Sequence, residues 1–202
     1  MRHQVDVELA NGGRDSFLLA GLGEEAPDFT LDDLDGRPVK LSDQRGSRVV
    51  LQWFNPLCPF TRHAHSKGLL SSYIEEARAA GVIWLAINSA ADRKMGGDPE
   101  TNRAALAEWG ADFPVLLDPD GRVGRRFDAT TTPEVFVIDE HGTLVYIGAL
   151  DNAPFGKPRG GGEVVNYVAQ VLRELDLGET LSAPYRQSYG CRVKYAQPTL
   201  GQ

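Results

Sequence analysis

The chain has 202 residues, of which 42% are hydrophobic and 24% are charged, the usual balance for a soluble globular protein that buries a full core. Its net charge of -7 argues against a nucleic-acid surface, and no apolar run is long enough to suggest a membrane span. The N-terminal residues carry charges of both signs without an apolar signal-peptide core. We therefore expect a cytoplasmic protein, or an exported one if a leader has been removed.

The pattern changes from irregular to regular near residue 24. Residues 1–23 predict an N-terminal extension with one hairpin, whereas alternating apolar residues on both sides of Asp35-Gly36 predict a small hairpin within the domain. Residues 48–54 are almost continuously apolar, which is typical of a central strand covered on both faces.

Helices and strands then alternate along the chain. Pro59 and the pair Asp98-Pro99 suit helix starts, and a valine-rich stripe that includes Val164 and Val165 predicts the last helix. The expected elements are a helix over 59–80, a strand over 82–87, a helix over 99–109, a strand over 115–117, a short helix over 120–127, a hairpin over 135–147 and a helix over 162–177.

This order predicts an α/β fold of thioredoxin-like type, a central mixed β-sheet flanked by helices, with the N-terminal hairpin extension added to it. We place the thioredoxin-like domain at residues 24–180 and a C-terminal tail with the second cysteine at residues 181–202. The two cysteines, Cys58 and Cys191, are too few and too far apart for a disulfide scaffold or a local zinc site.

Cys58 stands where the first long strand gives way to a helix, between Pro56 and Pro59. Binding crevices in open α/β sheets lie at the carboxyl ends of strands, and a helix N-terminus favours a thiolate over a thiol. The two prolines would hold the sulfur in that place. The alternative is a small buried structural cysteine, but the strand–Cys–Pro–helix context favours a reactive thiol.

Five stretches of the sequence resemble the redoxin branch of the thioredoxin superfamily, which contains the alkyl hydroperoxide reductase/thiol-specific antioxidant and peroxiredoxin-like proteins. The stretches are A-P-D-F-T-L (26–31), F-N-P-L-C-P-F (54–60), L-D-P-D-G (117–121), T-T-P-E-V-F-V-I-D (131–139) and Y-G-C-R-V-K-Y (189–195). They cover roughly residues 24 to 196, and the last two make the resemblance specific.

The resemblance implies roles for several residues. Cys58 matches the peroxidatic cysteine of peroxiredoxins, and Pro133 matches a cis-proline beside which the backbone of Thr132 grips an extended substrate chain. Asn55 stands where peroxiredoxins have the threonine of T-x-x-C and thioredoxin has the first cysteine of C-x-x-C. Its amide either donates to the thiolate or to a peroxide oxygen, or simply belongs to an Asn-Pro turn. The family threonine and arginine are absent here.

Four more residues near Cys58 are candidates for substrate binding or metal ligation. Pro59 and Arg62 join the expected substrate-binding residues, although Arg62 is equally typical of a solvated surface arginine. His63 and His65 point about 200° apart on a helix, so we expect no metal site there with Cys58.

Cys191 and Glu134 lie in the last two stretches of the resemblance. Cys191 is either a spare thiol or a resolving cysteine on a long, loosely structured tail, and Glu134 either lines the site or faces solvent.

These observations predict a thiol-dependent oxidoreductase without cofactor or metal. The main prediction is a peroxiredoxin-like peroxidase in which Cys58 reduces a hydroperoxide, Cys191 resolves the sulfenic acid and an external thiol reductant such as a thioredoxin-like protein resets the pair. One alternative is a thiol–disulfide reductase or exchange protein that acts on protein disulfides. Another is a non-enzymatic binding module or metallochaperone. The sequence indicates no nucleic-acid or membrane partner and leaves the oligomeric state open.

Overall fold

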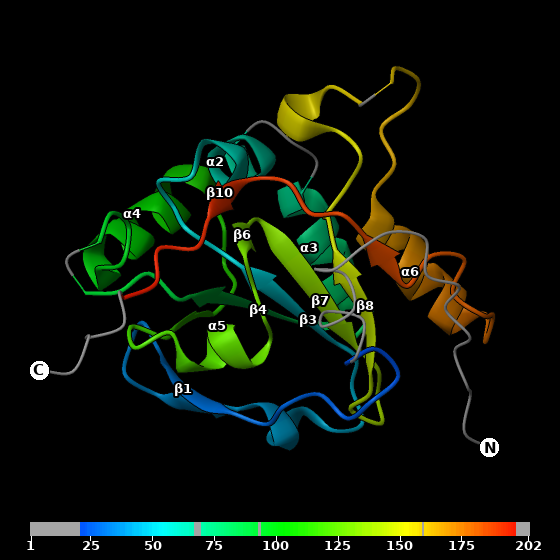
Figure 1. Ribbon diagram of the computed structural model, residues 1–202, viewed down its shortest axis with the longest axis horizontal. Coiled ribbons are helices and arrows are strands. Elements are labelled where there is room, and N and C mark those ends of the chain that lie inside the picture. The colour runs from blue at the N-terminus through cyan, green and yellow to red at the C-terminus, as the bar shows by residue number, and fades with distance from the viewer. Residues whose placement is uncertain (1–20, 67–69, 93, 159, 197–202) are drawn as a thin grey trace, which may run out of the picture.

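The computed structural model describes residues 21–66, 70–92, 94–158 and 160–196 (Figure 1). Its strands are β1 (Thr30–Asp33), β2 (Pro38–Lys40), β3 (Val49–Trp53), β4 (Ile83–Asn88), β5 (Val115–Leu117), β6 (Thr131–Thr132), β7 (Glu134–Ile138), β8 (Leu144–Gly148), β9 (Tyr185–Arg186) and β10 (Cys191–Arg192). Eight of them form one mixed sheet in the order β2-β1-β5-β4-β3-β7-β8-β9, and β10 pairs with β6 in a second, two-stranded sheet.

The helices confirm the predicted α/β order. They are η1 (Leu41–Gln44), α2 (Pro59–Ser66), α3 (Leu70–Ala79), α4 (Pro99–Trp109), α5 (Arg122–Arg126), η2 (Pro154–Gly156) and α6 (Tyr167–Asp176). The start of α4 is as predicted, because Asp98 accepts a hydrogen bond from the Thr101 N–H at 2.8 Å.

Two predicted helices were wrong in extent. The single helix expected over 59–80 is two helices, α2 and α3, on either side of residues 67–69, which lie outside the described part of the chain. The last helix begins at Tyr167, not at residue 162, because the Asn166 side chain caps it by accepting from the Ala169 N–H at 2.9 Å. Val164 and Val165 therefore lie before α6 and are 50% and 39% exposed instead of joining its buried stripe.

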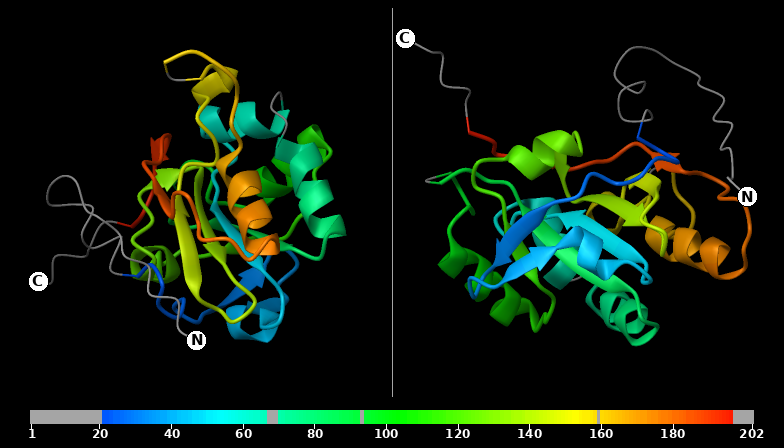
Figure 2. Two further views of the ribbon diagram at one scale, coloured as in Figure 1. Left: turned by 90° about the vertical axis from the view of Figure 1, so that its right-hand side faces the viewer. Right: turned by 90° about the horizontal axis from the view of Figure 1, so that it is seen from below.

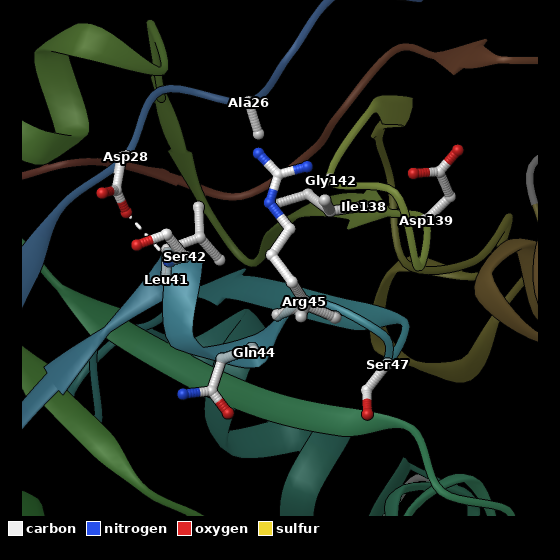
Figure 3. A pocket seen from close by; sticks show the side chains of 11 residues that line it. Ala26, Asp28, Leu41, Ser42, Gln44, Arg45, Ser47, Ile138, Asp139 and Gly142 are labelled. Atoms are coloured by element: carbon white, nitrogen blue, oxygen red, sulfur yellow. Dashed lines mark hydrogen bonds between the residues drawn. The ribbon is translucent and has the colours of Figure 1, made fainter.

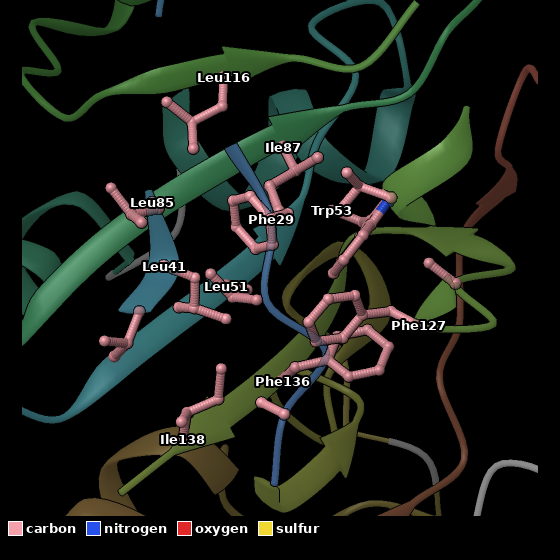
Figure 4. Packing of buried hydrophobic residues seen from close by; sticks show 14 of the residues in the cluster. Phe29, Leu41, Leu51, Trp53, Leu85, Ile87, Leu116, Phe127, Phe136 and Ile138 are labelled. Carbon is pink, nitrogen blue, oxygen red and sulfur yellow. The ribbon is translucent and has the colours of Figure 1, made fainter. Parts of the chain in front are cut away.

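The sheet separates two hydrophobic cores because successive strand residues point to opposite faces. On one face, α3 and α6 pack against β3, β4 and β7, and Figure 2 shows these two helices on the same side of the sheet. On the other face, α5 and the segment that leads into β1 cover the same strands (Figure 4). There, Trp53 of β3 contacts Phe136 and Phe127 with ring centroids 4.8 and 5.4 Å apart. Both faces of β3 are buried, as its apolar sequence predicts.

The two chain ends differ from their predictions. The hairpin expected in residues 1–23 falls almost entirely outside the described residues. The C-terminal tail was expected to be loosely structured, and this was wrong for residues 181–196. In that stretch β9 pairs in parallel with β8 of the main sheet, and β10 pairs antiparallel with β6. Within the described chain, no helix is long and apolar enough to cross a bilayer.

Candidate active site

The geometry around Cys58 comes from the junction of β3 with α2. After β3, the Cys58 N–H donates to the Asn55 carbonyl at 3.0 Å, which closes a turn, and α2 begins at the next residue. The Cys58 carbonyl then accepts from the Arg62 N–H at 2.9 Å as the helix starts. The Cys58 side chain is only 3% exposed, so its sulfur lies beneath the surface at the helix N-terminus.

The loop before β7 forms one wall of the site. The Thr132–Pro133 peptide bond is cis, as the resemblance implies for Pro133. The Cys58 sulfur lies 3.0 Å from the Thr132 carbonyl oxygen, to which a protonated thiol can donate. Thr132 is buried, whereas Pro59, the residue after Cys58, is exposed.

The tail brings Cys191 to the same place. In the β6–β10 pair, Cys191 lies directly opposite Thr132 and Arg192 opposite Thr131 (Figure 1). Cys191 is partly exposed, and both cysteines are free thiols. Each side chain shifts the pKa of the other, so the two sulfurs lie close enough to interact. The structure thus unites two cysteines that are remote in the sequence.

The two thiols differ in pKa. Burial opposes ionisation of Cys58, but hydrogen bonds from the Cys191 thiol, the Thr61 N–H and Thr132 outweigh it, so the pKa of Cys58 is lowered. Burial, together with the hydrogen bond to Cys58 and the charge of its thiolate, raises the pKa of Cys191 to about 11. Cys58 is therefore the group that ionises first, and Cys191 keeps the proton.

A buried carboxylate fixes the tail to the wall of the site. Glu134 is 1% exposed, which excludes the solvent-facing alternative. It accepts from the Thr130 N–H at 2.7 Å and from the Ser188 hydroxyl at 2.9 Å, so it joins the segment before β6 to the segment before β10. Burial raises the pKa of Glu134, although these hydrogen bonds oppose the shift.

Beyond β10 the tail is anchored again. The Val193 N–H donates to the Thr130 carbonyl at 3.0 Å, and the Tyr195 hydroxyl donates to the Ala129 carbonyl at 2.7 Å. Cys191 is therefore held between fixed points on both sides. Neither Glu134 nor Ser188 was identified as a tail anchor from the sequence. Glu134 lies in the stretch 131–139 that carries the family resemblance, whereas Ser188 lies just before the stretch 189–195.

Asn55 lies in the turn before Cys58, where its side chain makes two hydrogen bonds. Its side-chain oxygen accepts a hydrogen bond from the Leu57 N–H at 2.9 Å, and its side-chain amide donates one to the Met95 carbonyl oxygen at 2.9 Å. These are the contacts of the Asn-Pro turn alternative, so the side chain shapes the loop that carries Cys58.

The other candidates lie away from the sulfur. Arg62 pairs with Glu108 of α4 at 2.8 Å and is exposed, which matches the surface alternative. His65 is 3% exposed and stacks on Trp109, with ring centroids 5.1 Å apart. Among the described residues, no three His, Cys, Asp or Glu side chains gather as metal ligands.

A shallow pocket lies at the amino end of β3, the end opposite Cys58 (Figure 3). Arg45 and Asp139 are among its lining residues, and Asp28 accepts there from the Ser42 N–H at 2.9 Å. No cysteine lines this pocket, and Cys58 lies at the other end of β3.

Comparison with known proteins places these features in context. The model of the AhpC/TSA family matches residues 22–147. The thiol-disulfide oxidoreductase ResA of Geobacillus thermodenitrificans is 32% identical over 125 residues, which cover 61% of this chain and 66% of that protein. The chain spans just under two thirds of the length of this ResA and of the Bacillus subtilis ResA, 66% and 65% respectively.

Solved structures share the fold. An uncharacterized conserved protein from Geobacillus kaustophilus has a TM-score of 0.76 at 28% identity, over 88% of this chain and 93% of that one. A hypothetical protein from Sinorhizobium meliloti 1021 has a TM-score of 0.75 at 24% identity, over 85% and 93%. The redoxin resemblance and the thioredoxin-like fold are thereby confirmed, and the predicted class of thiol-dependent oxidoreductase agrees with the name of the ResA relatives. The family match ends before β10.

Proposed function

The chain belongs to the AhpC/TSA family, and we propose that within it this protein is a thiol–disulfide oxidoreductase whose redox couple is Cys58 with Cys191. The observation that carries the proposal is the antiparallel pairing of Cys191 with Thr132 beside the Cys58 sulfur. The site already holds an extended, cysteine-bearing segment where a peptide disulfide would bind. The names of the ResA relatives also favour disulfide exchange over the peroxidase prediction.

The chemistry follows from the unequal thiols. Cys58, with the lowered pKa, supplies the thiolate that attacks a substrate sulfur and releases the other substrate thiol. Cys191 then attacks the Cys58 sulfur of this mixed disulfide, which releases the second substrate thiol and leaves a Cys58–Cys191 disulfide. Two protein thiols are oxidised while one substrate disulfide is reduced. An external dithiol, such as a thioredoxin-like protein, would return the couple to its reduced state.

The peroxidase prediction stays as a second candidate because of one observation. The Cys58 sulfur lies beneath β10 and is only 3% exposed, so a small hydroperoxide reaches it more easily than a protein does. Attack on the peroxide would give a sulfenic acid at Cys58 and release water or an alcohol. Cys191 would condense with this sulfenic acid to the same disulfide, with loss of water.

One experiment tests the couple and separates the two oxidants. The reduced full-length chain is mixed with one equivalent of cystamine, a small disulfide, or of hydrogen peroxide, then acid-quenched and analysed by intact mass and non-reducing peptide mapping. The proposal expects a Cys58–Cys191 disulfide with cystamine, a stalled mixed disulfide at Cys58 in Cys191→Ser, and no reaction at Cys191 in Cys58→Ser. Much faster oxidation by the peroxide would favour the second candidate. Two unmodified thiols after both treatments would refute a redox role.

A further inference from the structure

Strand β10 occupies the edge on which the site would bind a polypeptide. Extended peptides are often recognised by addition to an open strand edge, where main-chain hydrogen bonds supply affinity. Here β10 fills the edge of β6, with Cys191 opposite Thr132 and Arg192 opposite Thr131. An external polypeptide can therefore reach this edge only after β10 has left it.

The residue before Cys191 defines what this edge accepts. A Cβ atom at Gly190 would lie 2.0 Å from the Thr132 carbonyl oxygen, and the φ angle of Gly190 is 144°. Contact and backbone conformation both exclude a side chain there. The same carbonyl oxygen lies 3.0 Å from the Cys58 sulfur, so this close approach is what brings the next residue of the strand to the thiolate. Any strand bound in this register needs glycine before its cysteine.

Strand β10 itself makes few contacts with β6. The strand has two residues, its Arg192 side chain is exposed, and the Thr132 hydroxyl reaches the Cys191 carbonyl only at 3.4 Å. The stronger contacts lie outside it, at Ser188 on one side and Val193 on the other. When β10 leaves β6, Val193 beside it moves away from the core on which it packs, while β9 stays paired with β8.

We propose that β10 is a tethered stand-in for the substrate, and that the protein acts on polypeptide disulfides in which the reacting cysteine directly follows a glycine. The proposal rests on the proposed thiol–disulfide exchange function and names the substrate class of that function. The incoming Gly-Cys strand replaces β10 on β6, and the Cys58 thiolate attacks its cysteine sulfur while the other half of the substrate disulfide leaves as a thiolate. When β10 returns, Cys191 loses its proton and attacks the Cys58 sulfur, and the peptide leaves as a thiolate from the edge that β10 reclaims.

The test measures peptide exchange at Cys58 in full-length variants that lack the second thiol. Two peptides are prepared as mixed disulfides with thionitrobenzoate: the sequence of residues 188–194, and the same sequence with alanine in place of glycine. Release of the coloured thiolate reports attack by Cys58. The variants are Cys191→Ser, in which β10 stays docked, and Gly190→Ala with Cys191→Ser, in which the new side chain forces β10 off β6. Cystamine, whose reaction is followed by intact mass, serves as the substrate without a strand.

The expected result has two parts. The glycine peptide reacts with the undocked variant at least about tenfold faster than the alanine peptide does, because alanine strongly disfavours this backbone conformation. The same glycine peptide reacts more slowly with Cys191→Ser, because the tethered strand competes at high effective concentration. Cystamine shows neither difference. Equal rates for the two peptides would overturn the glycine requirement, and equal rates for the two variants would overturn the role of β10.

Two controls keep these outcomes separable. Gly178→Ala introduces alanine at another positive φ, 65°, with no atom within 4 Å of its Cβ, so it reports the backbone effect away from the site. Ser188→Ala with Cys191→Ser loosens the tail from Glu134 while Gly190 stays, and it should raise the glycine-peptide rate if Gly190→Ala misfolds. If cystamine never yields a Cys58–Cys191 disulfide in the unmodified chain, the proposed function fails, independently of peptide preference.

Discussion

Two segments bring a cysteine to the same point of the molecule by different means. The segment from β3 into α2 is a buried strand, a turn and a helix, and its residues pack into both cores. The segment from β9 to residue 195 has two strands of two residues each. It is held by pairing with β8 and β6 and by hydrogen bonds to residues such as Glu134 and Ala129, and only Tyr185 and Val193 are partly buried against a core. The fold therefore depends on the first segment, while the coupling of the two sulfurs depends on the second.

Removing either sulfur should have the largest effect, because each of the two segments contributes one cysteine. We expect Cys58→Ser to lose at least about a thousandfold in turnover, because the attacking thiolate is gone. Cys191→Ser should keep the first exchange and stall as a mixed disulfide at Cys58. Steady-state turnover with a dithiol and a disulfide, beside single-turnover mass analysis, measures both. If Cys191→Ser turned over at the unmodified rate, the tail would have no part in the cycle.

Substitutions in the core and in the tail should differ in their effect on the free energy of unfolding. Phe136 contacts both Trp53 and Phe127 in the core, so Phe136→Ala should lower the free energy of unfolding by about 3–5 kcal/mol. Tyr195→Phe removes only the hydrogen bond from the tail to Ala129 and should cost about 1 kcal/mol. Urea unfolding measures both changes. Comparable losses would mean that the tail is as much a part of the cooperative core as β7 is.

Acid should weaken the first segment through His65 on the inner side of α2. Burial lowers the pKa of His65 from 6.5 to about 3, so this ring is neutral in the fold and binds a proton more readily when unfolded. Between these two values stability falls as pH falls, by on the order of 2 kcal/mol from about pH 7 to about pH 5. Urea unfolding at both pH values checks this. His65→Gln should flatten that part of the profile, and an unchanged slope would assign it to other groups.

The smallest expected effect is on the titration of Cys58. Because its pKa is lowered, alkylation of Cys58 by iodoacetamide should reach half its plateau at a lower pH than alkylation of an ordinary cysteine thiol does. Cys191→Ala removes a donor to the thiolate and should move this midpoint to higher pH, while Cys191→Ser, which keeps a hydroxyl, should move it less. A midpoint unaffected by Cys191→Ala would show that Thr132 and the Thr61 N–H set it without Cys191.

The sequence predicts elements such as the segment from β3 into α2 well and the tail from β9 to residue 195 poorly. Strand β3, the capped start of α4 and the hairpin of β7 and β8 have periodicity, caps and turns of their own, so local pattern was enough. Cys58 and Pro133 were identified because they lie in motifs next to such elements. Strands β9 and β10 are too short to have a period, and they exist only through pairing with distant backbone.

The errors have related causes. Val164 and Val165 continued the apolar stripe of α6 in sequence, but the Asn166 cap starts the helix after them. Glu134 and Ser188 meet through a contact between segments far apart in the chain, which single-sequence patterns do not report. For Asn55, both alternatives were chemically sound, and only the position of Met95 decided between them.

Strand β9 has a consequence for the protein's behaviour in concentrated solution. It covers the outer side of β8, where a Cβ at Gly148 would lie 1.8 Å from the Arg186 carbonyl oxygen, so the two backbones can meet only with glycine there. Without β9, the end of β8 at Ile147 and Gly148 would present unpaired amide and carbonyl groups at a sheet edge, the usual starting point for aggregation between molecules. The segment that carries the second cysteine thus also protects the molecule from self-association.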